Sequence, residues 1–177
     1  MTPWKAALRE GAVSGSLASL FSSCALTLSG RRENGRGAAP TNATSQWLWG
    51  REALRRNRTD GRHTVTGYLI HHAASTLWAV IHARVLSDRP EASRPGTVLA
   101  AAAATASVAA LVDFKFTPRR LSPGFEHRLS RPALVATYAC FAAGLALGSL
   151  AVRRRRQRAE RQGVPDSGSS SGAGLSR

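Results

Sequence analysis

The stretch LVATYACFAAGLALGSLAV, residues 134–152, decides the fold class of this chain. It contains no Asp, Glu, Lys or Arg. A helix of roughly 20 mostly apolar residues is long enough to cross the ~30 Å hydrocarbon core of a bilayer. Four arginines, Arg153–Arg156, follow the stretch directly. A charge-free apolar run with a basic flank is typical of a transmembrane helix.

Windows without a charged side chain recur along the chain. They cover residues 11–30, 63–83, 95–112 and 132–152, and the arginines are concentrated between them. A soluble amphipathic helix would instead carry a charge every few residues. We therefore predict an all-α integral membrane bundle of four transmembrane helices, at about 11–30, 64–83, 95–113 and 132–152. The alternative is a soluble helical bundle with Ala-rich buried helices.

The composition excludes several other classes of protein. The 177 residues suffice for one domain of ordinary size, and 43% of them are hydrophobic, which is too many for a chain that is disordered throughout. Two cysteines rule out a disulfide scaffold and a zinc site built from four thiolates. The net charge of +15 calls for anionic partners. Because the arginines flank apolar spans, we expect them to contact anionic lipid headgroups, and we expect no nucleic acid partner.

The predicted spans divide the chain into two parts. Residues 1–152 form the transmembrane domain, and residues 153–177 form a tail that is first basic and then Ser/Gly-rich and disordered. Four spans place both chain ends on one side of the membrane, the terminal side, and the connections 31–62 and 113–131 on the other, the loop side. Lys and Arg are almost equally numerous on the two sides, so their distribution does not decide the orientation. The arginine block after the last span favours cytoplasmic termini.

The first window has an alternative interpretation as a signal peptide, because Lys5 and Arg9 precede it. The segment Phe21–Cys24 also resembles a degraded lipoprotein cleavage site. However, no A-x-A cleavage site follows, and three further spans do. We therefore expect this window to remain in the protein as its first transmembrane helix.

The first connection contains a candidate interfacial helix at residues 41–58, TNATSQWLWGREALRRNR. Trp47 and Trp49 are its expected anchors, because tryptophan favours the headgroup zone and the neighbouring arginines favour anionic lipid. The alternative is a soluble loop that packs both indole rings onto the end of the bundle.

Small residues at four-residue spacing mark tight helix packing in membranes. The first span carries Gly11, Gly15, Ser19 and Ser23, and the fourth carries Ala136, Cys140, Gly144 and Gly148. Each set forms one stripe along its helix. We expect both stripes to pack within the chain, and a homo-oligomer interface is the alternative.

The second span carries most of the polar groups. His71, Ser75, Trp78 and His82 recur at offsets that return near one helical face. The topology gathers six polar side chains at the loop side: His71, His72, Asp113, Glu126, His127 and Tyr138. Ionisable groups inside a membrane usually face the bundle interior. A His–Asp pair there would relieve the cost of burying both groups.

This cluster has several interpretations. The first is a hydrogen-bonded network that fixes the helix order. The second is a proton or metal site of a small transporter or membrane enzyme, and the third is a haem site. Haem is disfavoured because only His127 could supply a second ligand from outside the second span. The sequence has no HExxH, CxxC, Walker loop, GxSxG or GxGxxG motif. We therefore predict no enzyme, no cofactor and no metal.

Three segments, APTNATSQWLWG (39–50), GYLIHHAASTLWA (67–79) and LSPGFEHRLS (121–130), resemble an uncharacterised group of small multi-pass bacterial inner-membrane proteins. The resemblance covers residues 10–150 and implies a location in the bacterial inner membrane, without implying an activity. Our leading hypothesis is a non-enzymatic structural or accessory membrane protein. The alternative is a small transporter or proton-coupled membrane protein that uses His71, His72 and Asp113.

Overall fold

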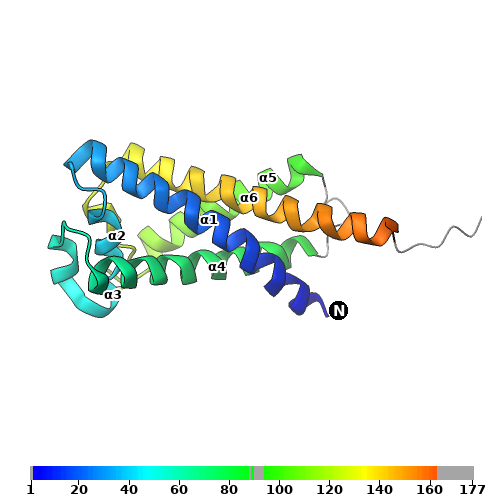
Figure 1. Ribbon diagram of the computed structural model, residues 1–177, viewed down its shortest axis with the longest axis horizontal. Coiled ribbons are helices and arrows are strands. Elements are labelled where there is room, and N and C mark those ends of the chain that lie inside the picture. Colours follow the sequence, from blue (N-terminus) through cyan, green and yellow to red (C-terminus); the bar gives the residue numbers. More distant parts are fainter. Residues whose placement is uncertain (1, 88, 90–93, 163–177) are drawn as a thin grey trace, which may run out of the picture.

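The computed structural model describes residues 2–87, 89 and 94–162, and every regular element in these residues is helical. Long helices pack side by side (Figure 1): α1 (Pro3–Asn34), α4 (Thr66–Ser87), α5 (Pro95–Leu111) and α6 (Arg131–Gln162). Short segments connect them: α2 (Ala39–Thr44), α3 (Gln46–Trp49), η1 (Gly50–Arg55), η2 (Gly61–Val65), η4 (Val112–Phe116) and η5 (Phe125–His127). The predicted all-α fold class is confirmed.

Three of the long helices are long and apolar enough to cross a membrane. They are α1, α5 together with the π-helical turn η4, and α6 as far as Glu160. Helix α4 falls short in mean hydropathy because it carries His71, His72 and His82. These apolar helices are what a membrane protein requires.

The long helices extend beyond the charge-free windows. Helix α1 begins at Pro3, where the side chain of Thr2 accepts the backbone N–H of Lys5 at 3.4 Å, and it ends where Gly35 adopts φ 67°. Helix α6 continues through the arginine block to Gln162. Charged side chains at the ends of these windows therefore lie on continuing helix. Residues 163–177 of the predicted disordered tail lie outside the described residues.

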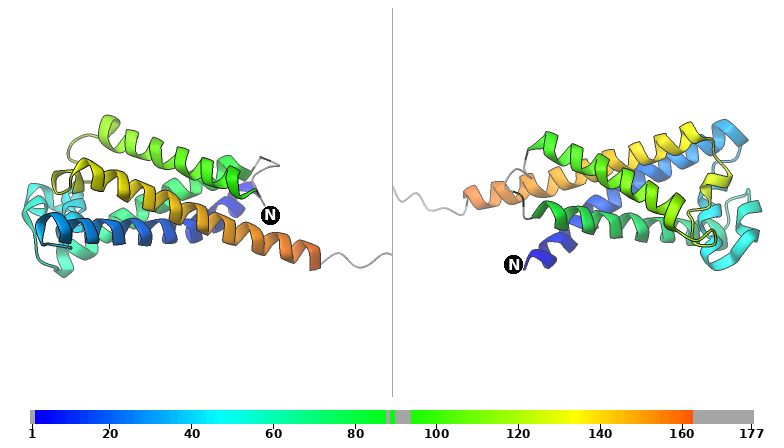
Figure 2. Two further views of the ribbon diagram at one scale, coloured as in Figure 1. Left: turned by 90° about the horizontal axis from the view of Figure 1, so that it is seen from above. Right: turned by 180° about the vertical axis from the view of Figure 1, so that it is seen from behind.

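Helix α1 packs against both α4 and α6 and runs antiparallel to each, while α5 packs on α6 and has a smaller contact with α4 (Figure 2). Small side chains make these contacts close. A Cβ atom added to Gly15 would lie 2.7 Å from the Cα of Thr76 in α4. A Cβ atom added to Gly144 would lie 2.7 Å from the Cα of Ala18 in α1. Both distances are far inside van der Waals contact, so each glycine permits a helix contact that alanine would prevent.

The two predicted small-residue stripes take part unequally in this packing. Gly11, Gly15 and Ser19 are buried, and Ser23 is half-buried. In α6, Gly144 and Gly148 are buried against α1, whereas Cys140 is half-buried and Ala136 is exposed. The glycines of both stripes are therefore used within the chain, and Ala136 lies outside the contact because the inward face of α6 at this level is formed by Ala133 and Thr137.

The first connection does not form the continuous helix expected over residues 41–58. It is divided into α2, α3 and η1, with a break at Gly50, where φ is 62°. Every residue of α2 is buried, and this short helix contacts α1 and α4. Apolar and small side chains from Ala39 to Ala43 fill the end of the helix packing, which leaves no exposed face on α2 for a membrane surface.

Both ends of the described chain lie at the same end of the molecule. Figure 1 shows the start of α1 beside the distal part of α6, while α2 and α3 lie at the opposite end. The first end corresponds to the predicted terminal side and the second to the predicted loop side. The segment 117–130, which joins η4 to α6, also lies at the loop side, as seen from above and behind (Figure 2).

Candidate functional site

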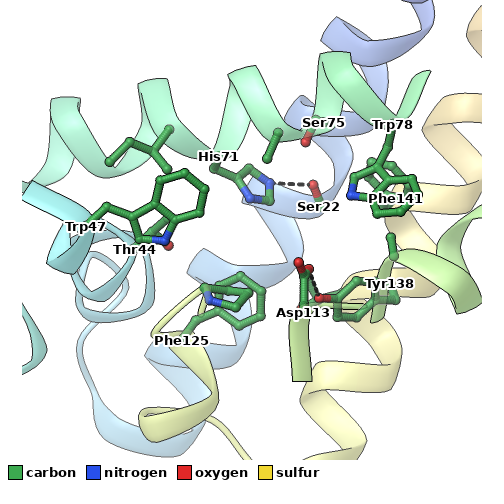
Figure 3. A pocket seen from close by; sticks show the side chains of 15 residues that line it. Ser22, Thr44, Trp47, His71, Ser75, Trp78, Asp113, Phe125, Tyr138 and Phe141 are labelled. Carbon is green, nitrogen blue, oxygen red and sulfur yellow. Dashed lines mark hydrogen bonds between the residues drawn. The ribbon is translucent and has the colours of Figure 1, made fainter. Parts of the chain in front are cut away.

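A pocket of about 60 Å³ lies inside the helix packing near the loop side (Figure 3). Its walls come from α1, α4, α5, η4 and α6, and α2, α3 and η5 line the end toward the loop side. The polar residues of the wall are Ser22, Thr44, His71, Ser75, Asp113, Thr137 and Tyr138. The rest of the lining is largely aromatic or aliphatic. A space of this size holds a few water molecules when polar groups are present to bind them.

His71 enters the pocket from α4. Its Nε2 lies 2.8 Å from the Oγ of Ser22 in α1, and the hydroxyl of Ser22 also donates to the carbonyl of Ala18 at 2.7 Å. Because a hydroxyl has one hydrogen, this arrangement assigns the imidazole proton to Nε2. The ring is packed edge-on against Phe125, with 6.4 Å between the centroids. The Nδ1 of His71 is thereby left as an unprotonated acceptor in the pocket.

Asp113 enters from the opposite wall (Figure 3). It lies in η4, and its Oδ2 accepts a 2.6 Å hydrogen bond from the hydroxyl of Tyr138 in α6. The ring of Tyr138 is held edge-on against Phe114 at 5.7 Å. The pocket thus contains a carboxyl group and an imidazole, each bonded to a neighbouring helix and not to each other.

The structure brings only part of the predicted polar cluster into the pocket. His71, Asp113 and Tyr138 line it, whereas His72 stacks on Tyr68 outside it, with 5.9 Å between the ring centroids. Glu126 and His127 lie in η5 and are not among the lining residues. The Oε1 of Glu126 accepts the hydroxyl of Ser122, and the side chain of His127 is more than half exposed. The adjacent residues His71 and His72 therefore differ in position, since His71 lines the pocket and His72 does not.

A set of buried hydrogen bonds closes the loop side of the pocket. Gln46 donates through Nε2 to the carbonyl of Ser122 at 2.8 Å, and the indole N–H of Trp47 donates to the same carbonyl at 3.1 Å. Trp49 instead donates to the carbonyl of Arg62, whose guanidinium lies 4.1 Å from the indole centroid. The two predicted anchors thus hold the loop-side segments together, and Trp47 also lines the pocket.

Asn42 is the centre of this closing network. It is fully buried, and its amide nitrogen donates to the carbonyls of Arg56 and Arg58 at 3.2 and 2.8 Å. Its carbonyl oxygen accepts the hydroxyl of Thr64 at 2.6 Å. One side chain therefore joins α2 to both ends of the segment that leads into α4.

Asp60 forms the start of the helical segment that becomes α4. Its carboxylate accepts the backbone N–H of His63, and this hydrogen bond lowers the pKa of Asp60 below its ordinary value. Nearby in η1, the contact with Arg56 lowers the pKa of Glu52 in the same way. Both carboxyl groups lie on the surface of the loop side and remain ionised there at neutral pH.

Polar side chains join each neighbouring pair of long helices. The contact between Ser22 and His71 joins α1 to α4, and the contact between His82 and Thr105, at 3.1 Å, joins α4 to α5. The Asp113–Tyr138 bond joins the α5–η4 segment to α6. A 2.8 Å ion pair between Glu10 and Arg153, both largely buried, joins α1 to α6. The result is a closed cycle of four polar contacts around the helix packing.

Sequence reasoning missed four partners in this cycle: Ser22, Thr105, Glu10 and Arg153. Ser22 lies one residue from the predicted stripe, and its polarity in an apolar window was its only signal. Glu10 and Arg153 were treated as the boundaries of their windows. The signal available was that Glu10 and Arg153 carry opposite charges and that both lie at the terminal-side ends of their predicted spans.

The described residues contain no group of three or more His, Cys, Asp and Glu side chains placed to hold a metal ion. Cys24 and Cys140 are both free thiols. No protein-family model matches the chain, and comparisons with curated proteins and with solved structures find no match. The function must therefore be argued from the geometry of the molecule.

Proposed function

We propose that this protein crosses the bacterial inner membrane four times and has a structural or accessory role, not an enzymatic one. The observation that carries the proposal is the division of α4 into two faces. Leu69, Leu77 and Val85 are more than half exposed along one face, whereas Ser75 and His82 are buried on the other. An apolar surface turned outward and a polar surface turned inward suit a helix surrounded by lipid.

The length of α4 agrees with this assignment. Its 22 residues extend about 33 Å at the ~1.5 Å rise of an α-helix, close to the ~30 Å thickness of the hydrocarbon core. Its histidines lower its hydropathy, but His82 is buried and His71 lies in the pocket, so neither needs to face lipid. The other long helices also expose large apolar side chains, among them Leu8, Leu20, Leu28, Leu99, Leu111, Val135 and Leu147.

The cycle of polar contacts supports a structural role for the buried polar groups. Within a bilayer, apolar surfaces discriminate poorly between neighbouring helices because lipid is equally apolar. Hydrogen bonds and ion pairs at the helix contacts can therefore select which helices lie together. Each of the four contacts described above joins a different neighbouring pair, which is what a network that fixes helix order requires.

A reporter experiment tests the number of crossings. A tag at the N-terminus and a reporter fused after Gln162 are assayed in membranes washed with carbonate, using alkaline phosphatase and a fluorescent protein in parallel. Four crossings place both chain ends in the same compartment, and we expect the fluorescent fusion to be the active one. If α4 lies outside the bilayer, the ends fall in opposite compartments. Recovery in the soluble fraction would contradict membrane insertion altogether.

The pocket supports a second candidate, a proton-coupled function. His71 and Asp113 face one interior space, and the Nδ1 of His71 has no partner among the described residues. An imidazole nitrogen and a carboxyl group beside a space for water are the elements of a proton relay. Their separate hydrogen bonds, to Ser22 and Tyr138, would hold both groups at the pocket wall.

Proteoliposomes that contain a pH-sensitive dye distinguish the two candidates. A potassium diffusion potential is applied, and the rate of proton entry is compared for wild type, His71→Gln, Asp113→Asn and the control His127→Gln, whose side chain is exposed. A proton-coupled protein loses flux in the first two variants at unchanged protein yield. A structural network loses yield or stability in those variants, with no flux above empty liposomes in any sample.

A further inference from the structure

The outer surface between α5 and α6 contains a groove of about 520 Å³, which shares Tyr138 with the lining of the interior pocket. Its walls are mainly small side chains, including Ala103, Ala106, Ala110, Ala139 and Ala142. Phe114 and Arg131 lie at its loop-side end, and Tyr138 lies about two helical turns further along α6. We infer that this groove binds an acyl chain of an anionic phospholipid whose phosphate contacts Arg131. The inference rests on the proposed function, since the groove meets lipid only if α5 and α6 cross the membrane.

The groove results from the residues that meet between the two helices. Alanine side chains are too short to fill the space between the two helices, and Val135, which also lines the groove, is 70% exposed. Protein interiors and interfaces are close-packed, so an apolar furrow of this volume at a lipid-facing surface needs an apolar occupant. A hydrocarbon chain is the apolar material that a bilayer supplies.

The length of the groove along α6 matches the thickness of one leaflet. Its lining on α6 extends from Arg131 to Ala142, which is about 16 Å at the ~1.5 Å rise per residue. Half of the ~30 Å hydrocarbon core is about 15 Å. A groove that starts at the headgroup level and ends near the middle of the bilayer therefore accommodates a chain from the loop-side leaflet.

The charge at the mouth of the groove favours an anionic headgroup. Arg131 is exposed at the first turn of α6, and Lys115, which follows the groove residue Phe114, is exposed as well. The adjacent acid Glu33 already accepts hydrogen bonds from Ser130. A guanidinium can bind a phosphate through two parallel hydrogen bonds, and each Lys or Arg near a membrane surface adds attraction for anionic lipid.

A second copy of the chain fits this groove less well. Two copies related by a two-fold axis along the membrane normal would place both Arg131 side chains at the same depth and close together. The lining contains no carboxyl side chain that could neutralise them. Like charges in a poorly solvated interface would oppose this dimer, whereas a phosphate neutralises Arg131.

Native mass spectrometry of the purified full chain tests the inference. The protein in detergent micelles is titrated in parallel with phosphatidylglycerol and with phosphatidylcholine of the same acyl chains. We expect one phosphatidylglycerol to be retained about fivefold more strongly than phosphatidylcholine. Arg131→Gln should remove this preference, and Ala139→Phe, which fills the groove, should remove retention of both lipids.

Matched controls keep the result specific to the groove. Arg120→Gln neutralises an exposed cation that is not among the groove residues, and Ala136→Phe enlarges an exposed side chain of α6 outside the lining. Both controls should retain lipid as wild type does. Equal retention of the two lipids by wild type, unchanged binding in Ala139→Phe, or a dimer that this substitution dissociates would each overturn the inference. Carbonate-washed membranes report insertion separately, so a stably inserted protein without bound lipid refutes this inference alone.

Discussion

Asn42 satisfies three backbone and side-chain groups from a fully buried position. Asn42→Ala would leave the carbonyls of Arg56 and Arg58 without this donor. We expect a loss of about 1–3 kcal/mol in the free energy of unfolding, because a buried polar group left unpaired retains its desolvation cost. Unfolding in mixed micelles of mild and denaturing detergent measures it. Asn34→Ala is the control, since its hydrogen bond to the carbonyl of Arg128 is exposed to solvent. An equal loss in both variants would contradict the assignment.

The hydroxyl of Tyr138 can be removed with little change in shape. Tyr138→Phe deletes the 2.6 Å hydrogen bond to Asp113 and leaves the ring contacts with Phe114 and Phe125 in place. We expect a destabilisation of about 0.5–1.5 kcal/mol in the same unfolding assay, the range typical of one hydrogen bond. Tyr68→Phe, at a partly exposed tyrosine, should change the unfolding free energy by less than this. The reverse order would show that the bond contributes nothing.

At the level of the helices, the contact between α1 and α6 depends on glycine. A Cβ atom at Gly148 would meet the Cα and Cβ of Ser14, and backbone cannot move aside as a flexible side chain can. Gly148→Ala should therefore destabilise the protein by about 1–3 kcal/mol or more, as overpacking does. Gly96→Ala at the start of α5 meets no atom within 4 Å and should be neutral or stabilising. Thermal unfolding of both variants in detergent is the measurement. A loss only in Gly148→Ala supports the close helix contact, and an equal loss in both variants would contradict it.

The start of α4 should be sensitive to acid through Asp60. The folded state lowers the pKa of Asp60, so this carboxylate stabilises the protein fully above its ordinary pKa of 3.8. The contribution is lost as the pH falls below that value toward the lowered one. We expect the thermal midpoint of wild type to fall more than that of Asp60→Asn between pH 6 and pH 3. Parallel curves for the two proteins would contradict this cap.

How far the sequence predicts these elements depends on the range of the interactions involved. Each charge-free window overlaps one of the long helices α1, α4, α5 and α6, because hydropathy and length are local properties. Residues 41–58 were expected to form one helix on the membrane surface, without the break at Gly50. The conformation of this segment depends instead on the buried contacts of α2 with α1 and α4, which are not local in sequence. Topology grouped His72 with His71, Asp113 and Tyr138, but only the last three line the pocket. His72 differs from His71 by its helical azimuth, which topology does not specify.

For the whole molecule, the polar contacts connect distant parts of the chain. The hydrogen bonds between α1 and α4 and between α5 and α6 lie in the loop-side half, and the bond from His82 to Thr105 lies nearer the terminal side. The ion pair between Glu10 and Arg153 closes the terminal side. Contacts at both ends restrict rotation of each helix about its axis more than contacts at one end would. Loss of either end should therefore loosen the helix packing rather than remove a single local bond.

The ion pair between Glu10 and Arg153 is the contact that holds the first long helix to the last at the terminal side. The two side chains are 11% and 14% exposed, and the Nε of Arg153 lies 2.8 Å from the Oε1 of Glu10. Glu10→Gln should destabilise the protein by about 3–5 kcal/mol, because it leaves the buried guanidinium without this compensating charge. The reversed pair, Glu10→Arg with Arg153→Glu, should recover at least half of the loss.

An exposed pair on the same helix supplies the control for this prediction. Arg156 and Glu160 are also 2.8 Å apart, but both are more than 60% exposed, so Arg156→Gln should change the unfolding free energy by less than about 1 kcal/mol. Unfolding in mixed micelles compares the four proteins under one condition. If Glu10→Gln is as stable as Arg156→Gln, the two charges are solvated where α1 and α6 meet, and the terminal side is held by the glycine contacts alone. If Glu10→Gln loses stability and the reversed pair recovers it, the attraction between the two charges fixes how α1 and α6 pair.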